Sequence, residues 1–555
     1  MEHKAKILYI CDNYTEQIYP SLVNKVSEKH SEKNGFFLDY EKAKPEIDSS
    51  LDLSSLLDGY DVIVLNYGVQ EALEKNSYDY SIQITKDIAK YADEQKKRVI
   101  LCKLPKTVKR AGKFNDEISE ISKQYQFRIA NIAFYWKNAH GKKLSIKSGK
   151  MSEDTVKLYV DAILPVLTRT KTLVLWQYNG RYAHCNYSCP YCYVATSVNK
   201  GMHIVHELDE WEKAFERHFG NKDTVFYFSY GEPTMGGKHF YEALEMIGRH
   251  PNWQVRMTSN VSIPLNRLLS STLAKEGRLN INASFHPTQV SVEKFIEQCN
   301  NIRKAGIEPS VIYVMYPDQI DDFETKYYPE FEKNHYRVHI RAFRGLYHGK
   351  KYPQMYTKEQ WEKTARYMDM TNFKYQLHAV MGLGRMSNLG MTHILVDNYG
   401  KIEMCDSYVG DRHYGNVFDD KIYLDLEPHP FPGLVPLAAV DDIADYTELE
   451  FLDLENNNVN DFNTQGGTIK NADDSIVYPF DTIDLKDKKL INELKKVPKP
   501  MVAAYKYWFN PKWFAQHFIY SYVIKKYGKY VFAWFRGKFR LLRQGNLKLK
   551  NFWHS

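Results

Sequence analysis

Residues 172–342 alternate between apolar segments of strand length and amphipathic segments of helix length, and this alternation constrains the fold more than any other feature. It is typical of βα units with a parallel sheet. Six strands separated by five helices fit a partial (β/α)6 barrel, whose sites form at the carboxyl ends of the strands. The predicted strands are Thr172–Gln177, Thr224–Ser229, Gln254–Thr258, Leu279–Ser284, Pro309–Met315 and Arg337–Ala342. The predicted helices are Glu207–Phe219, His239–Arg249, Leu265–Glu276, Val292–Ala305 and Asp322–Asn334.

Three of the seven cysteines lie close together just after the first predicted strand, as Cys185, Cys189 and Cys192. A Cys-x3-Cys-x2-Cys loop can place three thiolates around a cubane [4Fe–4S] cluster and leave the fourth iron without a protein ligand. A structural zinc site needs four ligands, usually as two pairs. No second pair at zinc spacing is nearby, and His184 is too close to Cys185 to complete a tetrahedron comfortably. A disulfide fits less well still, because the spacings show no disulfide framework.

The loop, with Tyr191 before its third cysteine, resembles the signature of the radical S-adenosylmethionine (radical SAM) enzymes. The resemblance implies two cofactors: a [4Fe–4S] cluster on the three cysteines, and SAM bound to the open iron. It also implies a reducing electron donor of the flavodoxin or ferredoxin type. One electron from the cluster would split SAM into methionine and a 5′-deoxyadenosyl radical, which abstracts hydrogen from an unreactive C–H bond.

Short polar motifs follow the next three predicted strands in the order that this family has. Tyr230-Gly231-Glu232-Pro233 resembles the Gly-Gly-Glu-Pro turn whose backbone holds the SAM amino group, with Tyr230 in place of the first glycine. Taken singly, each motif could be an ordinary turn. Their order after the cysteine loop favours a SAM site. The residues that the resemblance assigns to SAM are Tyr191, Tyr230, Gly231, Glu232, Pro233, Ser259, Asn260 and Ser284, with adenine against Val311–Met315.

Two further residues are candidates for catalytic roles. Arg341, on the sixth predicted strand, would reach the SAM carboxylate or the substrate, or else form an ordinary salt bridge. Residues 371–420 resemble the SPASM or twitch extension, which binds auxiliary clusters, because a predicted hairpin ends at Cys405. Ser387 occupies the place of an earlier cysteine, so we predict a module that lost its cluster. Cys405 would then be a hydrogen-atom donor or proton relay, a buried thiol, or a lone ligand.

Residues 1–165 are predicted to form a separate three-layer α/β unit with a parallel sheet. The unit resembles SGNH-type hydrolases: Asp12-Asn13 stands for Gly-Asp-Ser, Gly68-Val-Gln70-Glu71 for Gly-x-Asn-Asp, and Lys143-Leu-Ser145 for His-Leu-Ser. Because Asn13 replaces the serine, the serine mechanism is not available. We predict a non-catalytic SGNH-like or flavodoxin-like docking platform; a nucleotide- or carrier-binding domain is the alternative, without a Gly-x-Gly-x-x-Gly motif to support it. Its predicted strands are Lys6–Ile10, Val62–Asn66, Val99–Cys102 and Phe127–Phe134.

The last part of the chain is predicted to comprise a loop-rich connector, residues 421–487, and a basic, aromatic helical tail, residues 488–555. No Asp or Glu follows Glu493, whereas 14 Lys and Arg do, so this segment carries +14 in a chain of net charge +7. Aromatic residues interleaved with basic ones favour contact with an anionic membrane surface. The alternatives are binding along a polyanion and packing as a helical layer against the acidic remainder. No nucleic-acid module accompanies the tail, which disfavours nucleic acid as a partner.

Location and substrate follow from these features. No apolar stretch approaches the roughly 20 residues that span a bilayer, and free cysteines, an oxygen-sensitive cluster and no signal peptide indicate a reducing cytoplasm. The predicted function is radical SAM chemistry on a small molecule or glycan, including lipid-linked ones, at the cytoplasmic membrane surface. The alternative is a maturase for a peptide or protein, favoured by the SPASM-like hairpin but without a recognisable precursor-binding domain. A non-catalytic binding protein that retains a cluster is a third, weaker interpretation.

Overall fold

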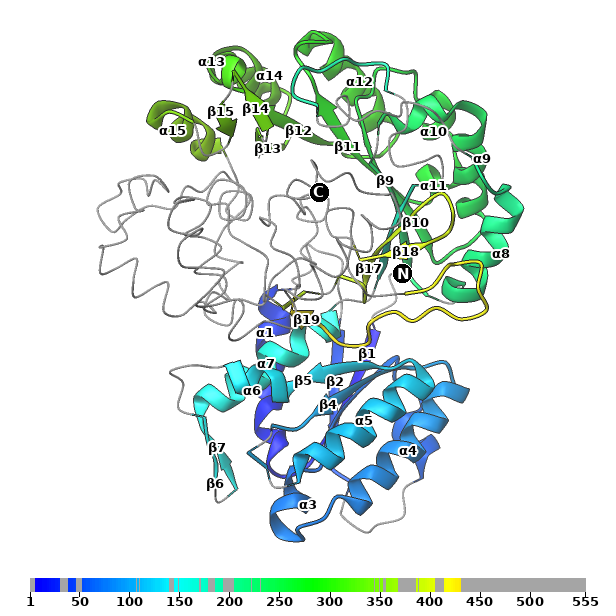
Figure 1. Cartoon of the computed structure of the whole chain (residues 1–555), viewed down its shortest axis with the longest axis vertical. Coiled ribbons are helices and arrows are strands. Elements are labelled where there is room, and N and C mark those ends of the chain that lie inside the picture. The colour runs from blue at the N-terminus through cyan, green and yellow to red at the C-terminus, as the bar shows by residue number, and fades with distance from the viewer. Residues whose placement is uncertain are drawn as a thin grey trace, which may run out of the picture.

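The computed structural model contains two large sheets, each with its own hydrophobic core (Figure 1). It describes residues 5–29, 38–45, 52–105, 107–108, 110–138, 144–147, 149–168, 171–177, 185–192, 204–220, 222–229, 231–343, 345–348, 350–352, 356–367, 386–387, 389–404 and 414–430.

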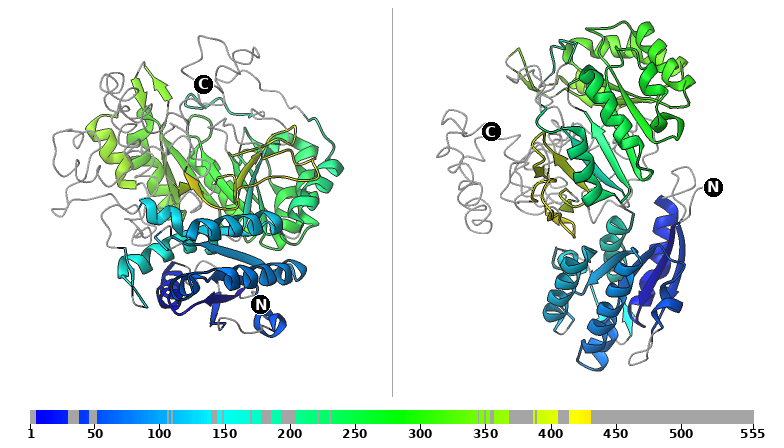
Figure 2. Two further views of the ribbon diagram at one scale, coloured as in Figure 1. Left: turned by 60° about the horizontal axis from the view of Figure 1, so that its bottom comes forward. Right: turned by 90° about the vertical axis from the view of Figure 1, so that its right-hand side faces the viewer.

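The N-terminal sheet has five parallel strands in the order β2-β1-β3-β4-β5, as in flavodoxin-like doubly wound sheets. Alternation along β1 sends Ile7 and Tyr9 into one core and Leu8 and Ile10 into the other, so that helices cover both faces. The strands are β1 Ala5–Cys11, β2 Leu38–Ala43, β3 Val62–Asn66, β4 Arg98–Lys103 and β5 Arg128–Asn131. The helices are α1 Tyr19–Lys29, α2 Leu53–Leu57, α3 Val69–Glu74, α4 Asp79–Glu94, α5 Ala111–Tyr125, α6 Ile132–Asn138 and α7 Glu153–Thr168. The predicted three-layer parallel arrangement is therefore present (Figure 2).

The second sheet has eight strands in the order β13-β12-β11-β10-β9-β8-β17-β18. Strands β8 to β13 are parallel and follow chain order, as expected for successive βα units. They are β8 Thr172–Trp176, β9 Thr224–Phe228, β10 Trp253–Ser259, β11 Leu279–Phe285, β12 Ser310–Met315 and β13 Val338–Ala342. Each lies within one or two residues of its predicted bounds.

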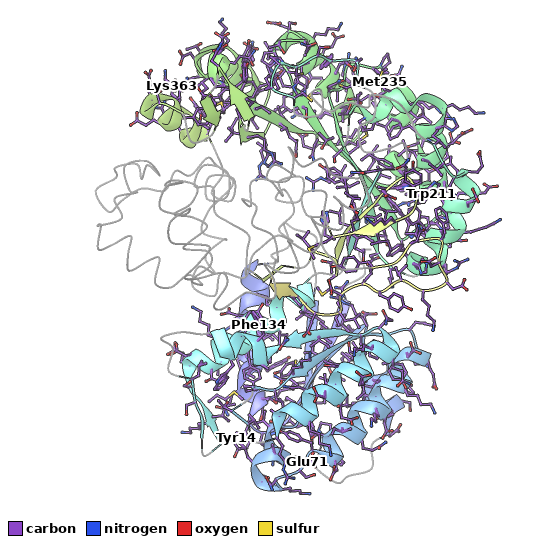
Figure 3. All side chains as sticks on the ribbon, in the orientation of Figure 1. Tyr14, Glu71, Phe134, Trp211, Met235 and Lys363 are labelled. Carbon is purple, nitrogen blue, oxygen red and sulfur yellow. The ribbon has the colours of Figure 1, made fainter. Side chains whose placement is uncertain are left out.

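Helices cover one face of this sheet through a large aromatic core. Trp211 of α8, labelled in Figure 3, belongs to this core. Trp176 of β8 contacts Trp211 and Phe215 of α8 at ring-centroid distances of 5.2 and 5.1 Å. Fully burying one such side chain contributes about 1.5–3 kcal/mol, so this layer firmly fixes the strand ends that carry the polar motifs. The helices are α8 Leu208–Phe219, α9 Gly237–Gly248, α10 Asn266–Leu269, α11 Thr272–Lys275, α12 Val292–Lys304, α13 Ile320–Asp322, α14 Tyr328–Lys333 and α15 Lys358–Tyr367.

Three predicted elements were wrong in part. Phe127–Phe134 is a strand only to Asn131, whose side chain accepts a hydrogen bond from the Phe134 N–H at 3.0 Å, the bond of a helix N-cap. The helix predicted at 265–276 is two short helices, because Ser271 caps a new helix start. The helix predicted at 322–334 contains a π-helical turn at Phe323–Tyr327. Strand β2 was missed because three of its six residues, Asp39, Glu41 and Lys42, are charged.

The predicted hairpin is present, although it does not form a separate sheet. Strand β17, His393–Val396, pairs with β18, Ile402–Glu403, in antiparallel fashion and with β8 in parallel fashion. It therefore extends the second sheet beyond its first strand. A SPASM module is not established by this hairpin, and Cys405 lies outside the described residues.

The segment 414–430 connects the two sheets. Its residues Val417 and Asp419 accept hydrogen bonds from His218 of α8 through their carbonyls. Farther along, the Leu426 carbonyl accepts from the Ile129 N–H of edge strand β5 at 2.7 Å, and Glu427 pairs with Lys103 at 3.1 Å. The start of the predicted connector thus lies against the edge of the N-terminal sheet.

Candidate active site

The cysteine loop, residues 185–192, stands between β8 and α8, at the carboxyl ends of the parallel strands. A turn closes its second half, because the Cys192 N–H donates to the Cys189 carbonyl at 3.1 Å. Cys185 is exposed, Cys189 buried and Cys192 in between. Burial, followed by the charges of the other two cysteines, raises the pKa of Cys189 to about 12, and burial also raises the pKa of Cys185. A bound cation such as iron would stabilise the thiolate forms of these cysteines.

The three thiols of the loop can each ligate a different iron atom of a cubane cluster. Among the described residues, no three His, Cys, Asp or Glu side chains are grouped closely enough to hold one metal ion. In a cubane each thiolate ligates a different iron, so its three cysteines stand farther apart than the ligands of a zinc ion. Sulfur also receives hydrogen bonds here: the Tyr187 N–H lies 3.4 Å from Cys185 Sγ. The loop thus fits a [4Fe–4S] cluster.

The residues after β10 hold the first half of the loop. The Asn260 side-chain amide donates to Asn186 Oδ1 at 2.9 Å and lies 3.7 Å from Cys185 Sγ. Ser262 Oγ accepts from the Asn186 amide at 2.8 Å and donates to Asn260 Oδ1 at 2.5 Å. Asn260, predicted as a SAM ligand, is therefore also a support of the cysteine loop.

The turn after β9 is joined to the end of β10 by Glu232. Its buried carboxylate accepts from Ser259 Oγ at 2.8 Å and from the Asn260 N–H at 2.7 Å. Thr234 donates to the same carboxylate through Oγ1 at 2.6 Å and through its N–H at 3.2 Å. Burial raises the pKa of Glu232, although these hydrogen bonds oppose the shift. Gly231 has φ 62°, a left-handed conformation that favours glycine.

The turn after β11 holds the second half of the loop. The Tyr191 hydroxyl and His286 Nδ1 are 2.9 Å apart, and their rings are stacked with centroids separated by 5.8 Å. Gln289 Oε1 accepts from the Ser188 N–H at 3.2 Å. Tyr316, after β12, lies 5.1 Å from the Tyr191 ring. The loop is therefore held from two neighbouring strand ends.

The structure brings some predicted site residues together and leaves others apart. Cys185, Glu232, Ser259 and Asn260 form one hydrogen-bonded group, with Pro233 buried in the same turn. Ser284 and Arg341 lie on β11 and β13 of the same sheet. Tyr230 and Cys405 are outside the described residues.

Four residues that hold the cysteine loop were given no role of their own from the sequence. Asn186 lies inside the cysteine motif, and Ser262, His286 and Gln289 lie within four residues of a strand end. Their proximity to strand ends was a usable signal. Their partners were not visible, because every one of these contacts joins segments at least 70 residues apart.

Comparison with known proteins agrees with this geometry. Residues 181–326 match the model of the radical SAM superfamily. The protein is a radical SAM enzyme. It uses a [4Fe–4S] cluster and SAM, which together supply a 5′-deoxyadenosyl radical when bound. No curated protein matches the chain.

Several solved structures are similar to parts of this radical SAM enzyme. Native anSMEcpe with bound AdoMet has 16% identity and a TM-score of 0.34, covering 44% of this chain and 78% of that one. Streptococcus suis SuiB bound to S-adenosylmethionine has 14% identity and a TM-score of 0.32, covering 56% and 76%. TesA has 15% identity and a TM-score of 0.25, covering 29% and 98%.

The N-terminal sheet carries a second polar cluster at the end of β1. Asp12 is buried, and its carboxylate accepts from the N–H groups of Gly68 and Gln70 at 3.1 and 2.9 Å and from Thr15 Oγ1 at 3.0 Å. Asn13 is exposed, and its N–H donates to Gln70 Oε1 at 3.3 Å. These bonds join the ends of β1 and β3, and the residue beside Asp12 carries a carboxamide rather than a hydroxyl.

We therefore expect no hydrolase chemistry from this cluster. The full-length protein should not cleave p-nitrophenyl esters, and a serine-directed fluorophosphonate should not label any residue in 1–165, because Asn13 has no hydroxyl to activate. Mass spectrometry of peptides from the treated protein measures this. Covalent labelling anywhere in residues 1–165 would contradict the prediction of a non-catalytic SGNH-like unit.

Proposed function

We propose that this radical SAM enzyme cleaves SAM reductively at a cluster held by Cys185, Cys189 and Cys192, and abstracts hydrogen from a small-molecule or glycan substrate. The observation that carries the substrate class is a polar patch on strands β10 and β11, on the face of the second sheet that lies away from its helices. The same face is apolar at β8, β9 and β17. Strands β8 to β13 would form a partial (β/α)6 barrel with that face inside. The cysteine loop stands at the carboxyl ends of these strands, where barrel enzymes place their chemistry.

Side-chain alternation defines this inner face. Residues 253, 255 and 257 of β10 pack in the core under the helices, so 254, 256 and 258 face the other way. Arg256 and Thr258 are partly exposed there. Asn282 Oδ1 accepts from Arg256 Nε and Nη2 at 3.1 Å each, in the amide orientation that satisfies both groups. Amide and guanidinium groups on a partly exposed face suit a substrate rich in hydroxyl or phosphate oxygens.

The proposed roles of the other site residues follow their positions. The Gly231 backbone, Ser259, Asn260, Ser284 and Tyr191 would bind SAM. The Glu232 carboxylate already accepts four hydrogen bonds, which supports a role in holding Ser259 and Asn260 rather than SAM itself. Arg341 would reach the SAM carboxylate or the substrate.

The substrate class can be tested with fractionated extracts. The anaerobically reconstituted protein is incubated with dithionite, SAM and either a small-molecule, a lipid or a protein fraction, and 5′-deoxyadenosine is measured. We expect a small-molecule or lipid fraction to raise 5′-deoxyadenosine formation above the rate without substrate, and this rise to survive protease treatment. A rise only with the protein fraction, abolished by protease, would instead support the peptide maturase.

The maturase remains the second candidate because of one observation, the β17–β18 hairpin. It lies beside β8, the strand that leads into the cysteine loop. A hairpin at the edge of the sheet could pair with an extended peptide. We place this candidate second because the inner face carries amide and guanidinium groups on β10 and β11, although it is apolar at β8, β9 and β17.

The C-terminal tail is proposed to bind the membrane surface. No helix among the described residues is long and apolar enough to cross a bilayer. With 14 basic residues after Glu493 and no acidic ones, full-length protein should bind anionic vesicles, and less so as salt rises, because each basic residue near the surface contributes about 1 kcal/mol of screened attraction.

Removing residues 500–555 should abolish this vesicle binding and leave SAM cleavage unchanged, as sedimentation with vesicles and 5′-deoxyadenosine assays would show. Neutral vesicles serve as the control. Insoluble truncated protein would mean that the tail packs as part of the core. A full-length protein that never sediments with anionic vesicles would contradict membrane binding.

A further inference from the structure

The second half of the cysteine loop depends on His286, which lies two residues after Ser284 and to which the sequence analysis assigned no role of its own. His286 is the first residue after β11. Its ring stacks on Tyr191 at an interplanar angle of 29° and meets the Tyr187 ring edge-on, with centroids 6.0 Å apart. Tyr187 and Tyr191 stand on either side of Cys189. His286 therefore contacts the loop at two points that bracket the central cysteine.

The hydrogen bond fixes the Tyr191 ring more tightly than stacking alone. Burial lowers the pKa of His286 to about 4, so the imidazole is neutral at physiological pH. A neutral imidazole has one donor and one acceptor nitrogen. With the proton on Nε2, Nδ1 accepts from the Tyr191 O–H, 2.9 Å away. Tyr316 packs on the Tyr191 ring, with centroids 5.1 Å apart, so the ring has contacts on three sides.

We propose that His286 is a positioning residue for SAM, acting through Tyr191. His286 holds the Tyr191 ring, which is next to Cys192 in sequence, in one orientation. Together with Gln289 it fixes the cysteine loop, which would hold the cluster whose open iron binds SAM. This proposal rests on the function proposed above, because it requires SAM to bind at the cysteine loop. A ring free to rotate would leave SAM with a less ordered surface and would weaken binding without removing a cluster ligand.

The test compares three substitutions, two at His286 and one at its partner Tyr191. His286→Phe keeps a stackable ring and removes the imidazole nitrogen, so the partly buried Tyr191 hydroxyl loses its hydrogen bond to His286 and keeps only its interactions with Thr288 and Cys189. We expect SAM binding to weaken about tenfold, with iron content still about four per chain. His286→Asn places an oxygen near the position of Nδ1 and should restore most of the affinity. Tyr191→Phe should weaken SAM binding no further when combined with His286→Phe, because paired residues are not additive.

Two readouts separate positioning from general instability. Equilibrium SAM binding and the change that SAM causes in the electron paramagnetic resonance spectrum of the reduced cluster are both measured. His250→Phe is the control outside the site. The His250 ring also stacks on an aromatic ring, that of Trp253, with centroids 3.8 Å apart, and its imidazole lies near Glu212 at 2.9 Å and Glu216 at 3.8 Å. This substitution should leave both readouts unchanged.

The outcomes divide cleanly. Three results would each overturn the positioning role. The first is wild-type SAM affinity and an unchanged spectrum in His286→Phe. The others are fully additive effects of His286→Phe and Tyr191→Phe, and loss of iron in both His286 variants. Wild-type protein that binds SAM yet forms no 5′-deoxyadenosine would count against the proposed function alone, since binding and spectrum still decide the role of His286.

Discussion

Replacing any one of Cys185, Cys189 and Cys192 by alanine should abolish both iron loading and 5′-deoxyadenosine formation. All three cysteines lie on one short loop, and two thiolates hold a cubane poorly. The wild-type protein should bind about four iron and four sulfide per chain after anaerobic reconstitution. Iron analysis, the visible absorbance of the cluster and chromatography of the SAM products measure the effect.

The matched control is Cys299→Ala. Cys299 is fully buried on α12, in the core under the sheet, and its loss should lower stability slightly without changing iron content. A loop variant that keeps about four iron would contradict the assignment of that cysteine. About eight iron in the wild type would contradict a different prediction, that the SPASM-like module has lost its cluster.

Replacing Glu232 by alanine should destabilise the protein and abolish SAM cleavage. The substitution leaves four donors, from Thr234, Ser259 and Asn260, without their acceptor. Each buried donor left unsatisfied costs about 1–3 kcal/mol, so a loss of at least about 3 kcal/mol is expected. Urea unfolding measures this loss. SAM cleavage should fail in folded protein too, because Ser259 and Asn260 lose the carboxylate that holds them.

Glu232→Gln should have an intermediate effect, since its amide oxygen accepts while its NH2 faces donors. Glu245→Gln is the control: Glu245 pairs with Arg267 on the surface, where an ion pair contributes at most about 1 kcal/mol. If Glu232→Ala unfolds at the wild-type urea concentration and yet cannot bind SAM, the carboxylate contacts SAM directly and its proposed supporting role is wrong.

The strands of the second sheet could be predicted closely because their signals are local. The bounds of β9, β11 and β12 agree with the prediction within one residue. Failures came where a polar side chain ended an element, as Asn131 and Ser271 do. Such a polar residue is equally compatible with the exposed face of a continuing element and with the N-cap position of a new helix. Only the hydrogen bond between its side chain and a backbone N–H distinguishes these two positions.

The sequence by itself determined the alternation of strands and helices, the cysteine spacing and the polar residues at the strand ends, since each depends on neighbours a few positions apart. Only the tertiary structure decided how these pieces meet. It joined β17 to β8, turned Glu232 onto the end of β10 and brought His286 to Tyr191. The physical reason is that pairing between distant segments depends on sheet order and register, which hydrophobic periodicity does not encode.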